Sequence, residues 1–295
     1  MNSNYTYNNS PIFKSWNVIY PVFIYFVVTN LAMTLFAMLA SFLGAEYQEQ
    51  YMALQTASVA VTIPFIARYY NKDRKEPTMF WKYTEMEFEK KSQKQKIGNG
   101  VLALLAGAVL GTALNNILAL TTLEKISEGY QEVNTYFFSG GIFFELLGAC
   151  LLTPFLEEML YRGVVYGRLC DLMIPDNGQK TEERSRREKR SQMAAMVFSA
   201  LLFGVLHMNL VQFVYAGILG IFLAWMMEKT AHFYGPLLAH MGANLVSVLR
   251  VETGMFAWMN QDEAVFAGAT ALFTALGVVL IVGIWLWNRR KSENA

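Results

Sequence analysis

The sequence contains little charge and almost no cysteine or histidine. Only 16% of its 295 residues are charged, whereas 54% are hydrophobic and 14% are aromatic. A soluble domain usually carries a larger share of charge and does not gather its apolar residues into long uncharged runs. The shortage of charge therefore excludes an ordinary soluble domain. It predicts an all-α, polytopic membrane protein, because helices satisfy their own backbone hydrogen bonds in lipid.

The two cysteines, Cys150 and Cys170, give no sign of redox chemistry or metal binding. If one helix carries both, they lie about 30 Å apart, which is too far for a disulfide. The sequence has no CxxC pair and no close Cys/His spacing, so we expect two buried structural thiols. Nucleic-acid-binding motifs are also missing, and the basic residues fall in loops, which excludes a nucleic-acid partner.

Long apolar runs predict about eight transmembrane helices. We expect them near residues 18–43, 51–66, 97–121, 141–166, 193–208, 209–227, 236–249 and 264–287. The apolar block from 193 to 227 is too long for one span, so we divide it near Asn209. The first run is too long for the core of a signal peptide, and we expect it to remain as an anchor. In the third span, Gly107 and Gly111 have the spacing that lets two helices approach closely.

Basic residues are distributed unequally between the loops on the two sides of the membrane. Of the 24 Lys and Arg residues, 21 lie on the side that holds both termini in an eight-span arrangement. The opposite loops hold only Lys125 and Arg250. Basic loops stay in the cytoplasm, so both termini are expected to be cytoplasmic. The charged stretch 68–96 is compatible with an amphipathic helix on the membrane surface or with a solvated loop.

The fourth span contains two adjacent carboxylates and an arginine inside the apolar run LLTPFLEEMLYRG, residues 151–163. A charged side chain at this depth costs roughly 2.5–3.5 kcal/mol on insertion scales, so each one needs a partner or a task. Glu158 and Arg162 are four residues apart and are predicted to form an ion pair on one helix face. Glu157 points about 100° away and requires partners from other helices. Pro154 predicts a kink just before them.

The chain has only three histidines, and two of them lie in apolar segments. One histidine in an apolar helix can be a satisfied core residue. However, His207 and His240, on two expected spans, together with a surplus glutamate on a third, indicate a joint site. Asn244 follows His240 by four residues and shares its helix face, as Phe203 does with His207. His232 lies in a polar turn, where we expect it to be solvated.

Straight helices would place these groups at different depths. At 1.5 Å per residue, His207 would lie roughly 20 Å from the cytoplasmic boundary, whereas Glu157 and His240 would lie near 8 Å. A shared site therefore requires that the fifth span enters the membrane later than Met193, or that its helix is tilted or broken.

Two chemistries could use this set of side chains. In the first, Glu157 acts as a general base toward water, and His240 and Asn244 donate hydrogen bonds to the oxyanion of a hydrated peptide carbonyl. In the second, Glu157, His207 and His240 hold a catalytic Zn²⁺ with an open position for water. The HExxH form of such a metal set is missing, so nothing in the spacing requires a metal cofactor, and both chemistries stay open at this point, although the resemblance described next leads us to favour the glutamate mechanism.

Three polar motifs follow one another on successive apolar segments: Glu157-Glu158-x-x-x-Arg162, Phe203-x-x-x-His207 and His240-x-x-x-Asn244. Together they closely resemble the motifs of the CPBP family. This family comprises the type II CAAX endopeptidases, also called CAAX prenyl protease 2, and bacterial relatives often described as bacteriocin-processing or immunity proteins. The resemblance covers about residues 144–248.

The resemblance implies an eight-helix intramembrane endopeptidase of a bacterial cell membrane. Glu157 and His207 would activate water, and His240 and Asn244 would stabilise the oxyanion. Glu158, Arg162 and Phe203 would brace the site. On this basis the chain divides into N-terminal helices (1–140), a catalytic core (141–250) and a final span with a basic tail (251–295). The expected partners are the lipid bilayer and a peptide or membrane-protein substrate; we assign neither a prenyl group to that substrate nor an oligomeric state.

Two other classes of function stay open at this point. A non-enzymatic immunity or scaffold protein could use the polar cluster only to lock helices together, and it would keep its phenotype after Glu157→Gln. A proton- or metal-coupled transporter could also use intramembrane Glu and His. The sequence shows no inverted repeat and no paired Gly/Pro-interrupted helices, which argues against a transporter.

Overall fold

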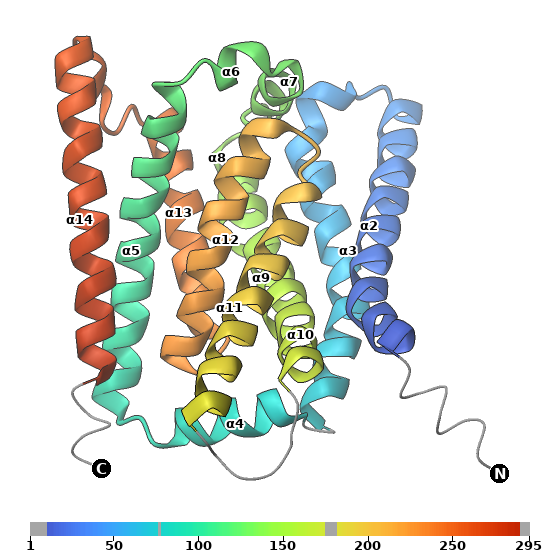
Figure 1. Cartoon of the computed structure of the whole chain (residues 1–295). Coiled ribbons are helices and arrows are strands. Elements are labelled where there is room, and N and C mark those ends of the chain that lie inside the picture. Colours follow the sequence, from blue (N-terminus) through green and yellow to red (C-terminus); the bar gives the residue numbers. More distant parts are fainter. Residues whose placement is uncertain (1–10, 76–77, 175–181, 290–295) are drawn as a thin grey trace.

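The structure is a computed structural model that describes residues 11–75, 78–174 and 182–289. These residues form helices and turns and contain no strand, which confirms the predicted all-α class. Figure 1 shows the long helices side by side in one bundle. They are α2 (Pro11–Phe42), α3 (Tyr47–Lys75), α5 (Gln93–Ala119), α11 (Glu182–Val205), α12 (Leu210–Thr230), α13 (Tyr234–Glu252) and α14 (Glu263–Arg289).

A further helical segment, from Ile142 to Met173, runs through the middle of the bundle (Figure 1). Its five consecutive pieces are α8 (Ile142–Phe144), η1 (Glu145–Leu152), α9 (Thr153–Glu158), η2 (Met159–Val165) and α10 (Tyr166–Met173). Short helices cover the two ends of the bundle. These are α4 (Met79–Glu89) at one end and α6 (Leu123–Ile126), α7 (Glu128–Phe137) and η3 (Ala257–Asn260) at the other.

Four described helices are long and apolar enough to cross a membrane. They cover Phe13–Phe42, Gln93–Ala119, Leu210–Thr230 and Glu263–Arg289. A fifth span results if α7 and the segment from Ile142 to Met173 are counted together, although the chain bends by 106° between them. The helices α3, α11 and α13 pack among these spans but are less apolar over their length. The membrane character is thus supported, and the count of eight spans stays a prediction.

The charged stretch 68–96 forms helices rather than a loop. α3 continues to Lys75, and α4 crosses the end of the bundle at which α2 begins and α14 ends (Figure 1). Phe80 and Trp81 of α4 are buried against the bundle, and the Phe80 ring lies 5.5 Å from that of Tyr166. The start of α2 and the end of α14 lie at this same end of the bundle, and the orientation of the termini in the membrane, with this end in the cytoplasm, stays a prediction.

The break predicted near Asn209 is confirmed. α11 ends at Val205 and α12 begins at Leu210, and the side chain of Asn209 caps α12 by accepting a hydrogen bond from the backbone N–H of Gln212 at 2.9 Å. Figure 1 shows α11 inclined relative to α14. The described part of α11 already begins at Glu182, eleven residues before the expected start of this span.

Glycines bring α5 and α13 into backbone contact, as their spacing predicts. A Cβ atom on Gly107 would lie 1.8 Å from the carbonyl oxygen of Ala239, and one on Gly111 would lie 3.0 Å from Cα of Ala243. Both partners on α13 directly precede a residue of the third motif. The depth of that motif in the bundle is therefore set by the close approach of these two helices.

We expect Gly107→Ala to lower stability by about 1–3 kcal/mol, because its Cβ meets backbone that cannot move without separating α5 from α13. The matched control is Gly217→Ala in α12, where no heavy atom lies within 4 Å of the new Cβ. This control should be neutral or stabilise by up to about 1 kcal/mol, since alanine favours helix more than glycine does. Thermal unfolding in detergent measures both. Equal unfolding temperatures for the two variants would contradict the close contact.

Candidate functional site

The Ile142–Met173 segment carries the first motif on α9, between two widened stretches of helix. η1 and η2 have π-helical hydrogen bonding, in which each N–H bonds five residues back. Pro154 lies in the first turn of α9 and has no N–H to donate. In a regular α-helix its ring would clash with the carbonyl group four residues before it. The widened turns of η1 lie directly before this proline, and the kink at Pro154 stays a prediction. The sharp bend occurs before Ile142, where Gly141 has a positive φ of 77°.

The predicted ion pair between Glu158 and Arg162 is confirmed. Nη1 of Arg162 donates to Oε1 of Glu158 at 3.0 Å, and both side chains are fully buried. Nη2 of Arg162 donates to the carbonyl of Gly220 on α12 at 3.1 Å. The guanidinium also lies over the ring of Phe203, 4.7 Å from its centroid. Arg162 thus joins the first motif to α11 and α12.

Both glutamates face one imidazole, that of His240 on α13. Nδ1–H of His240 donates to Oε1 of Glu158 at 2.8 Å, and Nε2 lies 3.8 Å from Oε2 of Glu157. The side chains of Glu157 and His240 are 10% and 5% exposed. The structure therefore brings together the surplus glutamate and a histidine from another helix, as predicted.

Glu157 has a second neighbour that the motifs do not indicate. The hydroxyl of Tyr25, on α2, donates to Oε1 of Glu157 at 3.5 Å, the long limit of a hydrogen bond. Tyr161 adds a buried phenol whose hydroxyl has no partner among the described residues, and its ring packs 5.0 Å from that of Phe203. Tyr25 lies in an apolar anchor without charge, and no local signal in the sequence connects it with a residue 132 positions away.

His207 reaches the site through Phe203. It lies in the turn after α11 rather than within a span, and its Nδ1 is 2.9 Å from the carbonyl oxygen of Phe203. The phenyl ring of Phe203 contacts both imidazoles edge-on, with centroid distances of 5.1 Å to His207 and 5.7 Å to His240. The second motif, on α11 and the turn after it, thus packs against His240 through the ring of Phe203.

Asn244 lies on the same helix as His240 but is held by the backbone. Its Nδ2 donates to the carbonyl of Ala149 in η1 at 2.8 Å. The side-chain amide therefore ties α13 to the first widened stretch, and its role as an oxyanion donor stays a prediction. The two cysteines are free and buried, as expected.

The positions of the side chains decide whether Glu157, His207 and His240 can hold Zn²⁺. Across residues 11–75, 78–174 and 182–289, no three His, Cys, Asp or Glu side chains are grouped closely enough to hold a metal ion. Nδ1 of His240 faces Oε1 of Glu158, and Nδ1 of His207 faces the carbonyl oxygen of Phe203. These contacts orient the two rings. The metal set does not fit this arrangement, and we derive no step through a metal.

We expect Arg162→Ala to destabilise the protein by about 3–5 kcal/mol, because it leaves the carboxylate of Glu158 buried without its guanidinium. Arg74→Ala is the matched control. Arg74 forms a pair of similar length, 2.8 Å, with Glu85, but their side chains are 38% and 42% exposed. Its loss should cost at most about 1 kcal/mol. Yield and thermal unfolding of both variants in detergent measure the difference, and similar losses would contradict the structural role of Arg162.

The comparison with known protein families agrees with this geometry. Residues 139–246 match the model of the family described as type II CAAX prenyl endopeptidase Rce1-like, and the matched range includes every residue of the three motifs. Neither a curated protein nor a solved structure matches the chain. Residues 139–246 of this integral membrane protein therefore carry an Rce1-like type II CAAX prenyl endopeptidase domain, consistent with the CPBP family that the three motifs resemble.

Proposed function

We propose that the protein is an intramembrane endopeptidase in which Glu157 activates water to hydrolyse a peptide bond. The substrate is a membrane-associated peptide or a membrane protein. One observation carries the proposal: a buried imidazole, that of His240, lies between two adjacent carboxylates, bonded to Glu158 and facing Glu157. A purely structural ion pair would need only Glu158 and Arg162. The second carboxylate is costly in this environment and so indicates a chemical task.

The charge of the cluster supports the presence of a mobile proton. Glu157 and Glu158 carry two negative charges and Arg162 carries one positive charge, in a region where these side chains are at most 10% exposed. An unbalanced buried charge is strongly disfavoured. One additional proton, on Nε2 of His240 or on Glu157, makes the cluster neutral. The two atoms that share it lie 3.8 Å apart.

This proton and the carboxylate of Glu157 provide the steps of hydrolysis. Glu157 removes a proton from water as the water oxygen bonds to the scissile carbonyl carbon. His240, with Nδ1–H bound to Glu158 and Nε2–H free, donates to the oxyanion that forms. Glu157 then returns the proton to the amide nitrogen as the C–N bond breaks. The products are one carboxyl group and one amine, and the enzyme regains its starting charge.

The other motif residues act around this pair. His207 lies in the turn after α11, in contact with the Phe203 ring that also contacts His240, and assists Glu157 in activating water. Asn244 serves as a second oxyanion donor only if its amide exchanges the carbonyl of Ala149 for that of the substrate. Tyr25 orients the carboxylate of Glu157 from α2.

The proposed topology has eight crossings with both termini in the cytoplasm. It is supported by the seven long helices and the Ile142–Met173 segment of the bundle, and by the position of α4 beside the start of α2 and the end of α14 (Figure 1). The stretch 68–96, which carries nine Lys and Arg residues, also lies at this end.

We expect Glu157→Gln to reduce cleavage by at least 10²-fold while the protein still folds, because the amide cannot act as a base. The matched control is Glu145→Gln, which removes another buried carboxylate from the same segment, one whose oxygens have no hydrogen-bond partner among the described residues. Membrane proteomes of cells that express only the wild type or one variant are compared. Uncleaved substrate should accumulate with Glu157→Gln and not with Glu145→Gln.

Cleavage of the identified substrate at the wild-type rate by purified Glu157→Gln would show that Glu157 is not the base. An unchanged phenotype after Glu157→Gln, without any accumulated substrate, would favour a scaffold or immunity protein. Solute uptake into proteoliposomes that depends on Glu157 would favour a transporter.

A further inference from the structure

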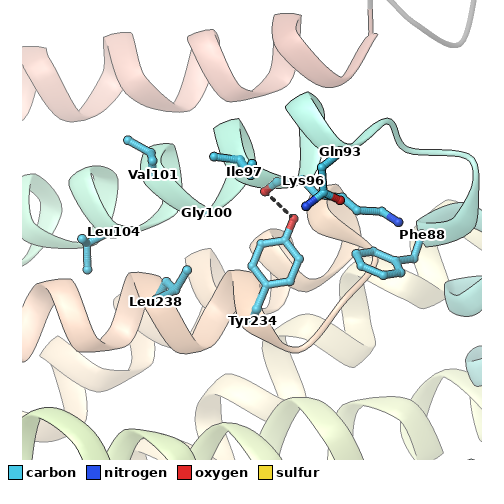
Figure 2. A pocket seen from close by; sticks show the side chains of 9 residues that line it. All are labelled: Phe88, Gln93, Lys96, Ile97, Gly100, Val101, Leu104, Tyr234 and Leu238. Atoms are coloured by element: carbon cyan, nitrogen blue, oxygen red, sulfur yellow. Dashed lines mark hydrogen bonds between the residues drawn. The ribbon is translucent and has the colours of Figure 1, made fainter.

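A groove opens on the outside of the bundle where α4, α5 and α13 meet. Its volume is about 640 Å³, within the range of small-molecule sites. Nine residues line it, and Figure 2 shows their side chains: Phe88, Gln93, Lys96, Ile97, Gly100, Val101, Leu104, Tyr234 and Leu238. The motif residues do not line the groove, so it is distinct from the proposed catalytic site.

The groove has a polar end and an apolar end. Figure 2 shows Phe88, Gln93 and Lys96 together at one end and Leu104 and Leu238 at the other. The polar end adjoins α4, which crosses the end of the bundle, whereas the apolar end extends along α5 and α13 toward its middle (Figure 1). A bilayer has the same order of polarity along its normal.

Lys96 is the only charged residue that lines the groove, and no carboxylate pairs with it in the part of the chain that the structure describes. Its ammonium group lies over the ring of Phe88, 4.0 Å from the centroid. Tyr234 keeps this corner in place, because its hydroxyl donates to the backbone carbonyl of Lys96 at 3.0 Å. The positive charge is therefore held at the polar end and available to an anion.

His232 borders this end without adding charge. It is half-buried rather than solvated, which corrects the sequence-based expectation, and its ring lies 4.5 Å from Phe88 and 5.2 Å from Tyr234. Burial, together with the nearby charges of Arg74 and Lys96, lowers the pKa of His232, so the imidazole is neutral at pH 7. The cation available to a ligand is Lys96.

The apolar end lies open to the surrounding lipid. Ile97 and Val101 are 60% and 54% exposed, and Gly100 leaves room at the floor, where a Cβ would come within 3.2 Å of the side chain of Leu238. Below the groove α5 and α13 close together at Gly107. An acyl chain fits this open end of the helix seam better than a helix or a folded domain, because the walls converge.

We propose that the groove binds one membrane phospholipid with an anionic headgroup. The phosphate lies against Lys96 and Gln93, and an acyl chain lies along Val101, Leu104 and Leu238. The charge of Lys96, the amphipathic order of the lining and the membrane setting of α5 support this occupant over a neutral lipid or a peptide. The site is separate from peptide hydrolysis, and its test does not depend on activity.

Native mass spectrometry of the detergent-solubilised protein tests the headgroup. The protein is titrated with phosphatidylglycerol or with phosphatidylcholine that has the same acyl chains. We expect one phosphatidylglycerol to bind more tightly than phosphatidylcholine. Lys96→Gln should weaken its binding by about fivefold, the contribution of one lysine to binding of an anionic lipid. Lys94→Gln, on an exposed side chain outside the groove, is the matched control and should change affinity by less than twofold.

The position of the acyl chain is tested by filling the groove. Leu104→Trp should prevent binding of the single lipid, whereas Leu105→Trp, 49% exposed but outside the groove, should not. Elution as a single species confirms that each variant folds. Equal affinity for the two lipids, equal loss in both lysine variants, or normal binding by Leu104→Trp would each overturn the proposal. The proposal would also be overturned if the wild-type protein retained a farnesylated peptide but bound no phosphatidylglycerol.

Discussion

One carboxylate oxygen, Oε1 of Glu158, accepts hydrogen bonds from both Arg162 and His240, and the arrangement of the site depends on it. Through Arg162 it is connected to the carbonyl of Gly220 on α12, and through His240 to α13. The fully buried glutamate therefore fixes the tautomer and orientation of the imidazole, and Nε2 is directed at Glu157. Glu158 therefore satisfies the structural contacts, and the chemistry that we propose for Glu157 does not require this second carboxylate to hold the helices.

The same geometry depends on how closely the helices that carry the motifs approach one another. Gly107 and Gly111 of α5 contact backbone at Ala239 and Ala243, the residues directly before His240 and Asn244. A wider seam would move both motif residues relative to the segment that carries the glutamates. From the opposite side, Asn244 bonds the carbonyl of Ala149 in the widened stretch η1. Packing and polar contacts thus place the third motif against the first.

Local patterns in the sequence predicted much of this arrangement. The pair Glu158–Arg162 follows from four-residue spacing on a helix, and the break near Asn209 follows from the length of the apolar block. The bond from His240 to Glu158 was not predicted, because a spacing of 82 residues carries no information about which glutamate faces which nitrogen. Tyr25 was missed for the same reason. The π-helical turns depend on packing around Pro154, which no periodicity reports.

Helix α13 takes part in both the site and the groove. Leu238 faces the groove, and His240, two residues later and about 200° around the helix, faces Glu158. Helices α5 and α13 are in backbone contact at Gly107 but leave space beside Gly100. An acyl chain in this space would contact the same two helices whose backbone contact holds His240 in place. The proposed lipid groove and the imidazole of the proposed catalytic site therefore lie on opposite faces of one helix.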